Sequence, residues 1–172
     1  MPLDLTPDTP EAFLCAVMAR SADATTETIA ALADEFGALR GRTEAYDFDM
    51  TSYYEAEMGS GLCKALAWFG PLVEPAELVQ RKQATIAFER ARSGADQRRT
   101  VNVDPGLLSV DSLVLATTKA SGHRICMAPG LWAEVTLRFE KGAYRRQPWT
   151  YLDYQREDVG AFLLSVRATL LG

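Results

Sequence analysis

The sequence predicts an α+β protein with one mixed or antiparallel sheet, and three observations support this fold class. The chain opens with an apolar run, an amphipathic helical pattern and a second strand-like segment, which together predict a β-α-β unit. A helical middle follows, and after residues 93–94 the pattern changes to short segments rich in β-branched and aromatic residues. Helices and strands that are separated along the chain in this way are typical of α+β domains.

The β-α-β opening is predicted within residues 13–48. Residues 13–18 form an apolar run of strand length, and Ser21 is placed to cap the helix that follows. Gly37 stands where a helix C′ residue belongs, and residues 42–48 form the second strand. The apolar face of the helix repeats at i, i+3, i+4 and i+7, through Ile29, Leu32, Ala33 and Phe36.

The middle of the chain carries two further helical patterns. The first covers residues 62–69 and is stopped by Gly70 and Pro71. The second begins at Pro75, a favoured residue for the first helical position, and extends to Arg92. The first pattern repeats the spacing of the opening helix, through Leu62, Ala65, Leu66 and Phe69.

The second half of the chain predicts an antiparallel β-meander and a C-terminal helix. Turn-forming residues separate the strands, and links this short make neighbouring strands antiparallel. The closing helix follows Glu157 and Asp158. A ferredoxin-like sheet satisfies this pattern, and the strand order stays open. The four strands are expected at residues 100–104, 113–119, 123–127 and 131–139.

Composition and charge narrow the class of protein. The 172 residues are 48% hydrophobic and 24% charged, which fits one soluble domain over residues 1–172, with residues 1–10 as a flexible leader. No apolar run approaches the roughly 20 residues of a membrane span, so no membrane partner is expected. The acidic, proline-rich start is unlike a secretory signal, and the three cysteines form no CxxC pair. We therefore expect a cytoplasmic protein.

The net charge of −5 disfavours nucleic acid as a partner. A group of basic residues near the middle of the chain is expected to form a solvated helix face rather than a nucleic-acid site. This group comprises Arg81, Lys82, Arg90, Arg92, Arg98 and Arg99.

A polar sheet face is predicted from strict alternation along two strands. If the strands are neighbours, then Asn102, Asp104, Glu134, Thr136 and Arg138 converge on this face. The two carboxylates could hold a divalent cation such as Mg²⁺ or divide the roles of acid and base, with Asn102 and Thr136 as ligand contacts. The alternative is the solvated side of a one-sided antiparallel sheet.

The hairpin at residues 117–124 gathers hydroxyl, basic and imidazole groups. Thr118, Lys119 and Arg124 suit a phosphate or carboxylate, and His123 could transfer a proton near neutral pH. The alternative is that His123 caps the end of a core face, because Ile125 and Met127 would point to the same side of the strand as His123.

Two segments, residues 46–58 and 149–154, interleave aromatic and acidic residues. They could line the mouth of a pocket or contact a protein partner, and the alternative is core packing. The candidate ligand contacts in them are Tyr54, Trp149, Tyr151 and Asp153.

The order of these motifs resembles a bacterial family catalogued as a domain of unknown function, number 4416. Some members are labelled GTP-binding, so the resemblance implies a guanine nucleotide. The sequence nevertheless contains no GxxxxGK[ST] and no GxGxxG motif. The resemblance rests on residues 46–59, 101–106, 114–119, 123–125, 133–137 and 149–154.

Together these features predict a protein that binds a small anionic, phosphate-bearing ligand on the polar sheet face. Lys119 and Arg124 would hold the anion, and Asp104 and Glu134 would hold a metal ion or act as acid and base. His123 would transfer a proton. The alternative is a non-catalytic protein-interaction or scaffold module. Whether the protein is an enzyme stays open.

Overall fold

The computed structural model describes residues 8–172, so residues 1–7 of the predicted leader lie outside the described part. The fold is α+β, as predicted: a nine-stranded antiparallel sheet, a β-α-β start and a C-terminal helix. The strands are β1 (Glu11–Ala19), β2 (Leu39–Arg42), β3 (Tyr46–Asp47), β4 (Cys63–Val73), β5 (Val101–Leu108), β6 (Ser112–Thr117), β7 (Ile125–Ala128), β8 (Leu131–Glu140) and β9 (Ala143–Arg146). The α-helices are α1 (Ala22–Phe36), α2 (Glu55–Met58), α3 (Leu78–Ala91) and α4 (Glu157–Leu170), and 3₁₀ turns cover Pro75–Glu77 and Leu152–Gln155.

The sheet has the strand order β2-β4-β1-β5-β6-β8-β7, with β3 beside β4 and β9 beside β8. Strand β1 lies near the centre, where Ala16 is opposite Leu66 on β4 and opposite Asp104 on β5. Helices cover both faces of β1, which explains its continuous apolar sequence.

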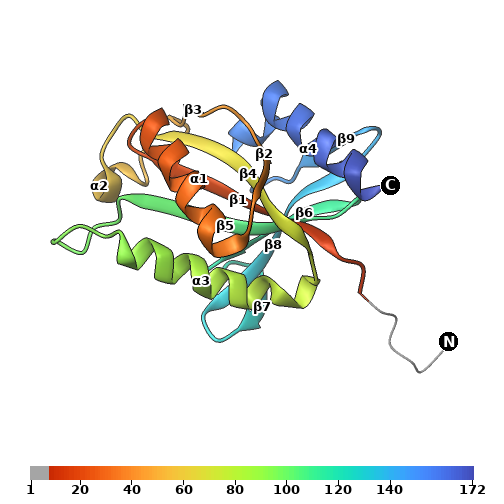
Figure 1. Cartoon of the computed structure of the whole chain (residues 1–172), viewed down its shortest axis with the longest axis horizontal. Helices are drawn as coiled ribbons and strands as arrows, with labels where there is room; N and C mark the ends of the chain where they lie inside the picture. The colour runs from red at the N-terminus through yellow and green to blue at the C-terminus, as the bar shows by residue number, and fades with distance from the viewer. Residues whose placement is uncertain (1–7) are drawn as a thin grey trace.

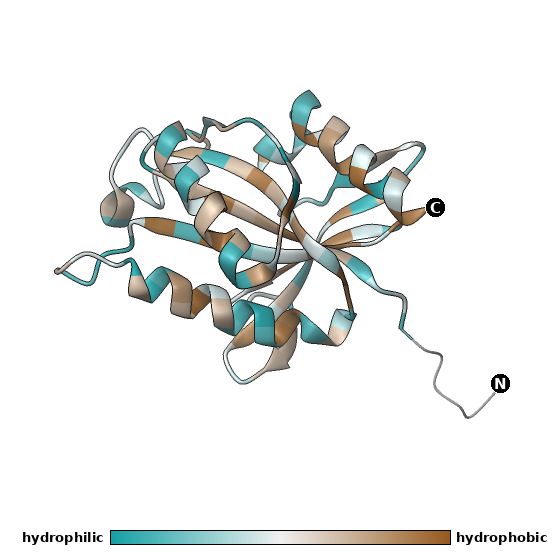
Figure 2. Cartoon of the chain, viewed as in Figure 1, coloured by the Kyte–Doolittle hydropathy of each residue, from teal (hydrophilic) through white to brown (hydrophobic). Residues whose placement is uncertain are grey.

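The helices pack against two main cores, one on each face of the sheet (Figure 1), and a smaller third cluster contains Phe48, Tyr54 and Met58. On one face α1 and α3 pack through residues that include Ile29 and Phe88, and on the other α4 packs through Val159 and Leu163. Figure 2 shows the hydrophobic residues concentrated in the central strands, with hydrophilic residues along the outer sides of the helices. Among the described residues, no helix is both long enough and apolar enough to cross a membrane.

The predicted helix over residues 62–69 is wrong: this segment lies in strand β4. Almost every residue of the strand is apolar because both faces are buried, so a helical spacing can be found in it by chance. Gly70 does not end the element. It has a φ of 63°, and a Cβ there would lie 2.5 Å from the Phe36 carbonyl oxygen, so the position requires glycine.

Other predictions hold with changes at the boundaries. The helix expected from Pro75 begins as a 3₁₀ turn and continues as α3, and the closing helix is α4. The strand expected at residues 42–48 is split between β2 and β3. In the meander, β6 and β7 do not pair with each other, because β8 lies between them. Strand β9 was not predicted.

Strands β5 and β6 pair over only part of their length. Gly106–Leu108 lie opposite Leu113–Leu115, whereas β5 begins at Val101. A Cβ on Gly106 would lie 2.5 Å from a Leu115 side-chain carbon and 2.6 Å from the Val114 carbonyl oxygen. Glycine therefore allows the close approach of the two strands just before they separate.

Helix α3 lies against the part of β5 that β6 leaves unpaired. The backbone N–H of Val103 donates to Glu89 Oε1 at 2.6 Å, and Lys82 Nζ donates to the Val103 carbonyl at 3.4 Å. Two helix side chains thus satisfy backbone groups that a neighbouring strand would otherwise satisfy.

Candidate functional site

A cavity of about 290 Å³ opens where β5 and β6 separate, and α3 closes its base. This volume is at the lower end of the range for small-molecule sites, which is about 300–1,000 Å³. Most of the residues predicted as a site line the cavity, from separate parts of the chain. They are Tyr54, Asn102, Asp104, Thr118, Lys119, Arg124, Glu134, Thr136, Trp149 and Tyr151.

Three predicted residues do not line the cavity. Arg138 is exposed and pairs with Glu140 at 3.5 Å, because the register of β8 shifts opposite β6. Asp153 is fully buried behind the wall, and His123 lies beside the wall. The predicted polar face therefore exists, but without Arg138.

His123 is held by contacts on three sides. Its Nε2 lies 2.9 Å from Glu134 Oε2, and its Nδ1 lies 3.0 Å from Ser121 Oγ. The imidazole stacks on Trp149, with ring centres 4.4 Å apart and an angle of 12°. Two residues after His123, Ile125 is 72% exposed, whereas Met127 is partly buried against the core that contains Phe88. The core face therefore does not extend to His123.

The hairpin places two cations at the mouth of the cavity. Arg124 Nε donates to Glu134 Oε2 at 2.9 Å, and Arg124 NH1 donates to the Lys119 carbonyl at 2.8 Å. Lys119 Nζ lies 3.8 Å from the centre of the Tyr53 ring. Within residues 8–172, no carboxylate lies within 4 Å of the Lys119 ammonium.

The floor of the cavity is a chain of hydrogen bonds and ion pairs. Lys82 Nζ lies 3.5 Å from Asp104 Oδ1, and Asn102 Nδ2 donates to Asp104 Oδ2 at 2.8 Å. Arg99 NH1 donates to Asn102 Oδ1 at 2.8 Å, and Arg99 Nε and NH2 donate to the two carboxylate oxygens of Glu57 at 2.8 and 2.6 Å. Glu57 lies in the short helix α2, so this pair ties α2 to the floor.

The pKa values of these groups follow their surroundings. The hydrogen bond from Arg99 holds the pKa of Glu57 below its usual value, and Glu57 in turn raises the pKa of Arg99. Burial raises the pKa of Glu89, against the opposing effect of the Val103 N–H. Burial also raises the pKa of Tyr54, with Asp104 adding to the effect.

Lys64 and Asp153 form a buried ion pair beside the cavity. Lys64 Nζ lies 2.7 Å from Asp153 Oδ2, and the Tyr46 hydroxyl donates to the same oxygen at 2.8 Å. The ammonium also lies 5.0 Å from the Phe48 ring centre and 4.5 Å from that of Tyr154. Lys64 lines the cavity, whereas Asp153 supports it from behind.

The two aromatic–acid segments meet at this wall. Phe48 and Tyr151 are in edge contact with ring centres 5.9 Å apart, and Phe48 and Tyr54 are 6.2 Å apart. Trp149 Nε1 donates to the Val135 carbonyl at 3.0 Å, which fixes its ring beside His123. The aromatic residues therefore form part of a wall rather than two separate clusters.

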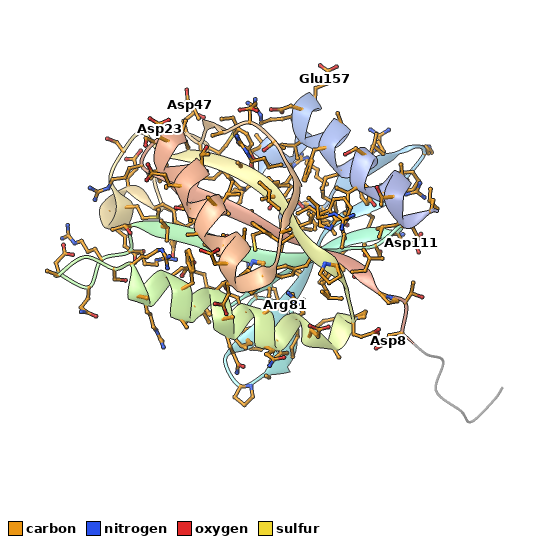
Figure 3. The ribbon with its side chains drawn as sticks, in the orientation of Figure 1. Asp8, Asp23, Asp47, Arg81, Asp111 and Glu157 are labelled. Atoms are coloured by element: carbon orange, nitrogen blue, oxygen red, sulfur yellow. The ribbon has the colours of Figure 1, made fainter. Side chains whose placement is uncertain are left out.

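Lys64, Lys82 and Arg99 line the cavity although they were not predicted as site residues. Lys82 was expected on a solvated face but is buried, and its neighbour Arg81 packs over the Phe13 ring at 4.5 Å on the inner side of α3 (Figure 3). A signal was present in the helix itself. The positions Leu78, Lys82, Thr85 and Glu89 are spaced as one helical face, and all four are buried.

The arrangement does not favour the predicted metal site. Within residues 8–172, no group of three or more His, Cys, Asp or Glu side chains is placed to hold a metal ion. Asp104 is already in contact with Lys82 and Asn102, and Glu134 with His123 and Arg124.

The fold and the cavity define an α+β domain with a polar, cation-lined site between two separating strands. The chain belongs to a family described as a domain of unknown function, DUF4416, whose model matches residues 9–170. No curated protein and no solved structure matches the chain.

Proposed function

We propose that the protein binds a small anionic, phosphate-bearing ligand in the cavity between β5 and β6. The observation that carries the proposal is Lys119, a cation in the lining with no carboxylate partner among the described residues. Two of the other lining cations, Lys64 and Arg99, are paired with Asp153 and Glu57, which lie outside the lining. Five cations face the cavity, namely Lys64, Lys82, Arg99, Lys119 and Arg124. The three carboxylates in the lining are Glu89, Asp104 and Glu134.

Lys119 and Arg124 are the anion-binding groups of this proposal. Lys119 has no carboxylate partner in the described part of the chain, so its ammonium is available to a ligand. Arg124 uses Nε and NH1 in the hairpin and keeps further N–H groups for a ligand oxygen. Glu134 holds Arg124 and His123 in place, and His123 is the candidate for proton transfer.

Thermal unfolding with added ligands tests the proposal. The panel contains inorganic phosphate, sugar phosphates, small carboxylates and guanine and adenine nucleotides, each with and without Mg²⁺. A ligand at 100 times its Kd stabilises the folded state by about 2.7 kcal/mol, which corresponds to a Tm increase of several degrees at this size.

Three variants locate the site. Lys119→Ala should remove most of the increase in Tm, whereas Arg90→Ala, which changes an exposed cation on the outer side of α3, should leave it intact. An unchanged Tm with every compound would contradict the proposal. So would an increase that Lys119→Ala and Arg124→Ala both leave unaffected.

A second candidate function is binding of a protein partner, and one observation favours it. Three large side chains in the two aromatic–acid segments are exposed: Tyr53 is 56% exposed, Leu152 54% and Tyr151 42%. Exposed apolar surface of this kind is typical of interaction sites. A stoichiometric partner whose binding survives Lys119→Ala but is lost with Tyr53→Ser and Leu152→Ser would support this function over the first.

A further inference from the structure

The cavity has two chemically different ends. At the floor each cation is close to a carboxylate: Lys82 to Asp104, Arg99 to Glu57 and Lys64 to Asp153. At the mouth Lys119 has no carboxylate within 4 Å among residues 8–172. The floor is therefore polar but balanced in charge. At the mouth Glu134 contacts Arg124, which leaves Lys119 as the cation without a carboxylate partner in the described part of the chain.

The floor presents a hydrogen-bond donor and an acceptor side by side. Lys82 has three N–H donors and contacts two acceptors, the Val103 carbonyl at 3.4 Å and Asp104 Oδ1 at 3.5 Å. Asp104 accepts from Asn102 and Lys82 and, as a carboxylate, has further lone pairs. Its side chain is 34% exposed, which leaves it accessible from the cavity.

This pair of groups matches a hydroxyl better than a phosphate. A hydroxyl can accept from Lys82 and donate to Asp104 at the same time. A phosphate oxygen cannot donate, and next to Asp104 and Glu89 it would meet two negative charges. The ligand's phosphate is therefore directed to Lys119 and Arg124, and its hydroxyl groups to the floor.

We propose that the ligand is a phosphorylated sugar or polyol of about monosaccharide size, bound with its hydroxyl groups against Lys82 and Asp104 and its phosphate at Lys119 and Arg124. The proposal rests on the anion-binding function proposed above. The cavity volume of about 290 Å³ fits one sugar ring, and the rings of Tyr54 and Tyr151 supply apolar surface for its C–H groups.

Calorimetric titration of the full chain with five probes tests this assignment. Glucose 6-phosphate and ribose 5-phosphate should bind at least about ten-fold more tightly than inorganic phosphate and phenyl phosphate, because only the sugar phosphates reach the floor with hydroxyl groups. Phenyl phosphate controls for size and apolar contact, and GMP tests for recognition of a base.

Variants test which end of the cavity binds the phosphate and which binds the hydroxyl groups. Asp104→Asn should lower the affinity for the sugar phosphates about ten-fold and change the affinity for inorganic phosphate by less than about two-fold. Lys119→Ala should lower the affinity for all phosphates alike. Asp111→Asn makes the same chemical change near the C-terminus, away from the cavity, and should have no effect (Figure 3).

The outcomes separate this proposal from the one on which it rests. Inorganic phosphate or phenyl phosphate binding as tightly as the sugar phosphates would overturn the sugar assignment and leave anion binding standing. GMP binding ten-fold more tightly than ribose 5-phosphate would overturn it in favour of base recognition. No binding of any probe at millimolar concentration would overturn both. The comparison in the unaltered protein decides even if Asp104→Asn fails to fold.

Discussion

Lys64 on β4 and Asp153 in the 3₁₀ turn before α4 form an ion pair of 2.7 Å in which the Asp153 side chain is completely buried. The pair joins the central sheet to the segment that leads into the last helix. Asp153 also accepts from Tyr46, while its other oxygen, Oδ1, is buried without a hydrogen-bond partner among the described residues. The pair is thus a buried contact between distant parts of the chain, directly behind the cavity.

Removing one partner of this pair should be strongly destabilising. Asp153→Ala leaves the Lys64 ammonium buried without a counter-charge, and we expect a loss of about 3–5 kcal/mol in the free energy of unfolding by urea. Replacing Lys64, Asp153 and Tyr46 together with Met, Leu and Phe should recover much of this loss. The control Glu140→Ala breaks an exposed pair with Arg138 and should change stability by less than about 1 kcal/mol. A loss for Asp153→Ala no larger than for the control would contradict the expectation.

Glu89 should make the protein less stable as the pH rises. Burial raises its pKa in the folded state, so between its ordinary value of 4.5 and the raised folded value the folded state binds more protons than the unfolded state. Stability is then lost as the pH increases through this interval. Glu89→Gln keeps an acceptor for the Val103 N–H and removes the titration.

Urea unfolding of the Gln variant and the unaltered protein from pH 4 to pH 8 measures this effect. The Gln variant should gain stability relative to the unaltered protein as the pH rises, with the difference constant above the folded pKa of Glu89. Glu27→Gln, an exposed change on α1, is the control and should give a flat difference. If the difference in stability between Glu89→Gln and the unaltered protein also stayed constant with pH, burial would not raise the pKa of Glu89 in the folded protein.

Gly106→Ala should disrupt the point at which β5 and β6 separate. The added Cβ would lie 2.5 Å from Leu115 and 2.6 Å from the Val114 carbonyl, so the strands must move apart. We expect a loss of about 1–3 kcal/mol in the free energy of unfolding, as for other overpacked positions. Gly122→Ala is a matched control because no atom lies within 4 Å of its added Cβ. Equal stability of the two variants would contradict the close approach of the strands.

The ion pair between Glu57 and Arg99 should hold the segment that contains α2. Glu57→Ala removes the two-bond contact at 2.8 and 2.6 Å, and we expect chymotrypsin to cleave after Tyr53 about five-fold faster. Glu55→Ala serves as the control, because Glu55 is exposed and lies two positions before Glu57 in the same helix. Cleavage at the same rate in both variants would show that the pair does not restrain this segment.

Local sequence signals predicted much of the secondary structure. Ser21 caps α1 as expected, with its side chain accepting from the Ala24 N–H at 3.1 Å, and the 3₁₀ turn that precedes α3 begins at Pro75. These elements depend on caps, turns and periodicity within a few residues, which the sequence records directly. Strand β4 was mistaken for a helix because burial on both faces leaves no alternation to read.

Local patterns in the sequence were sufficient to predict the α+β class, the polar sheet face and the basic hairpin that carries Lys119 and Arg124. Which of these groups meet depends on the arrangement of the strands and helices in space. Lys82 and Lys64 enter the cavity because α3 lies under the gap between β5 and β6 and because Asp153 is folded behind β4. Such contacts depend on strand order and on side chains that satisfy distant backbone or charged groups. No local pattern specifies a partner that lies far away along the chain.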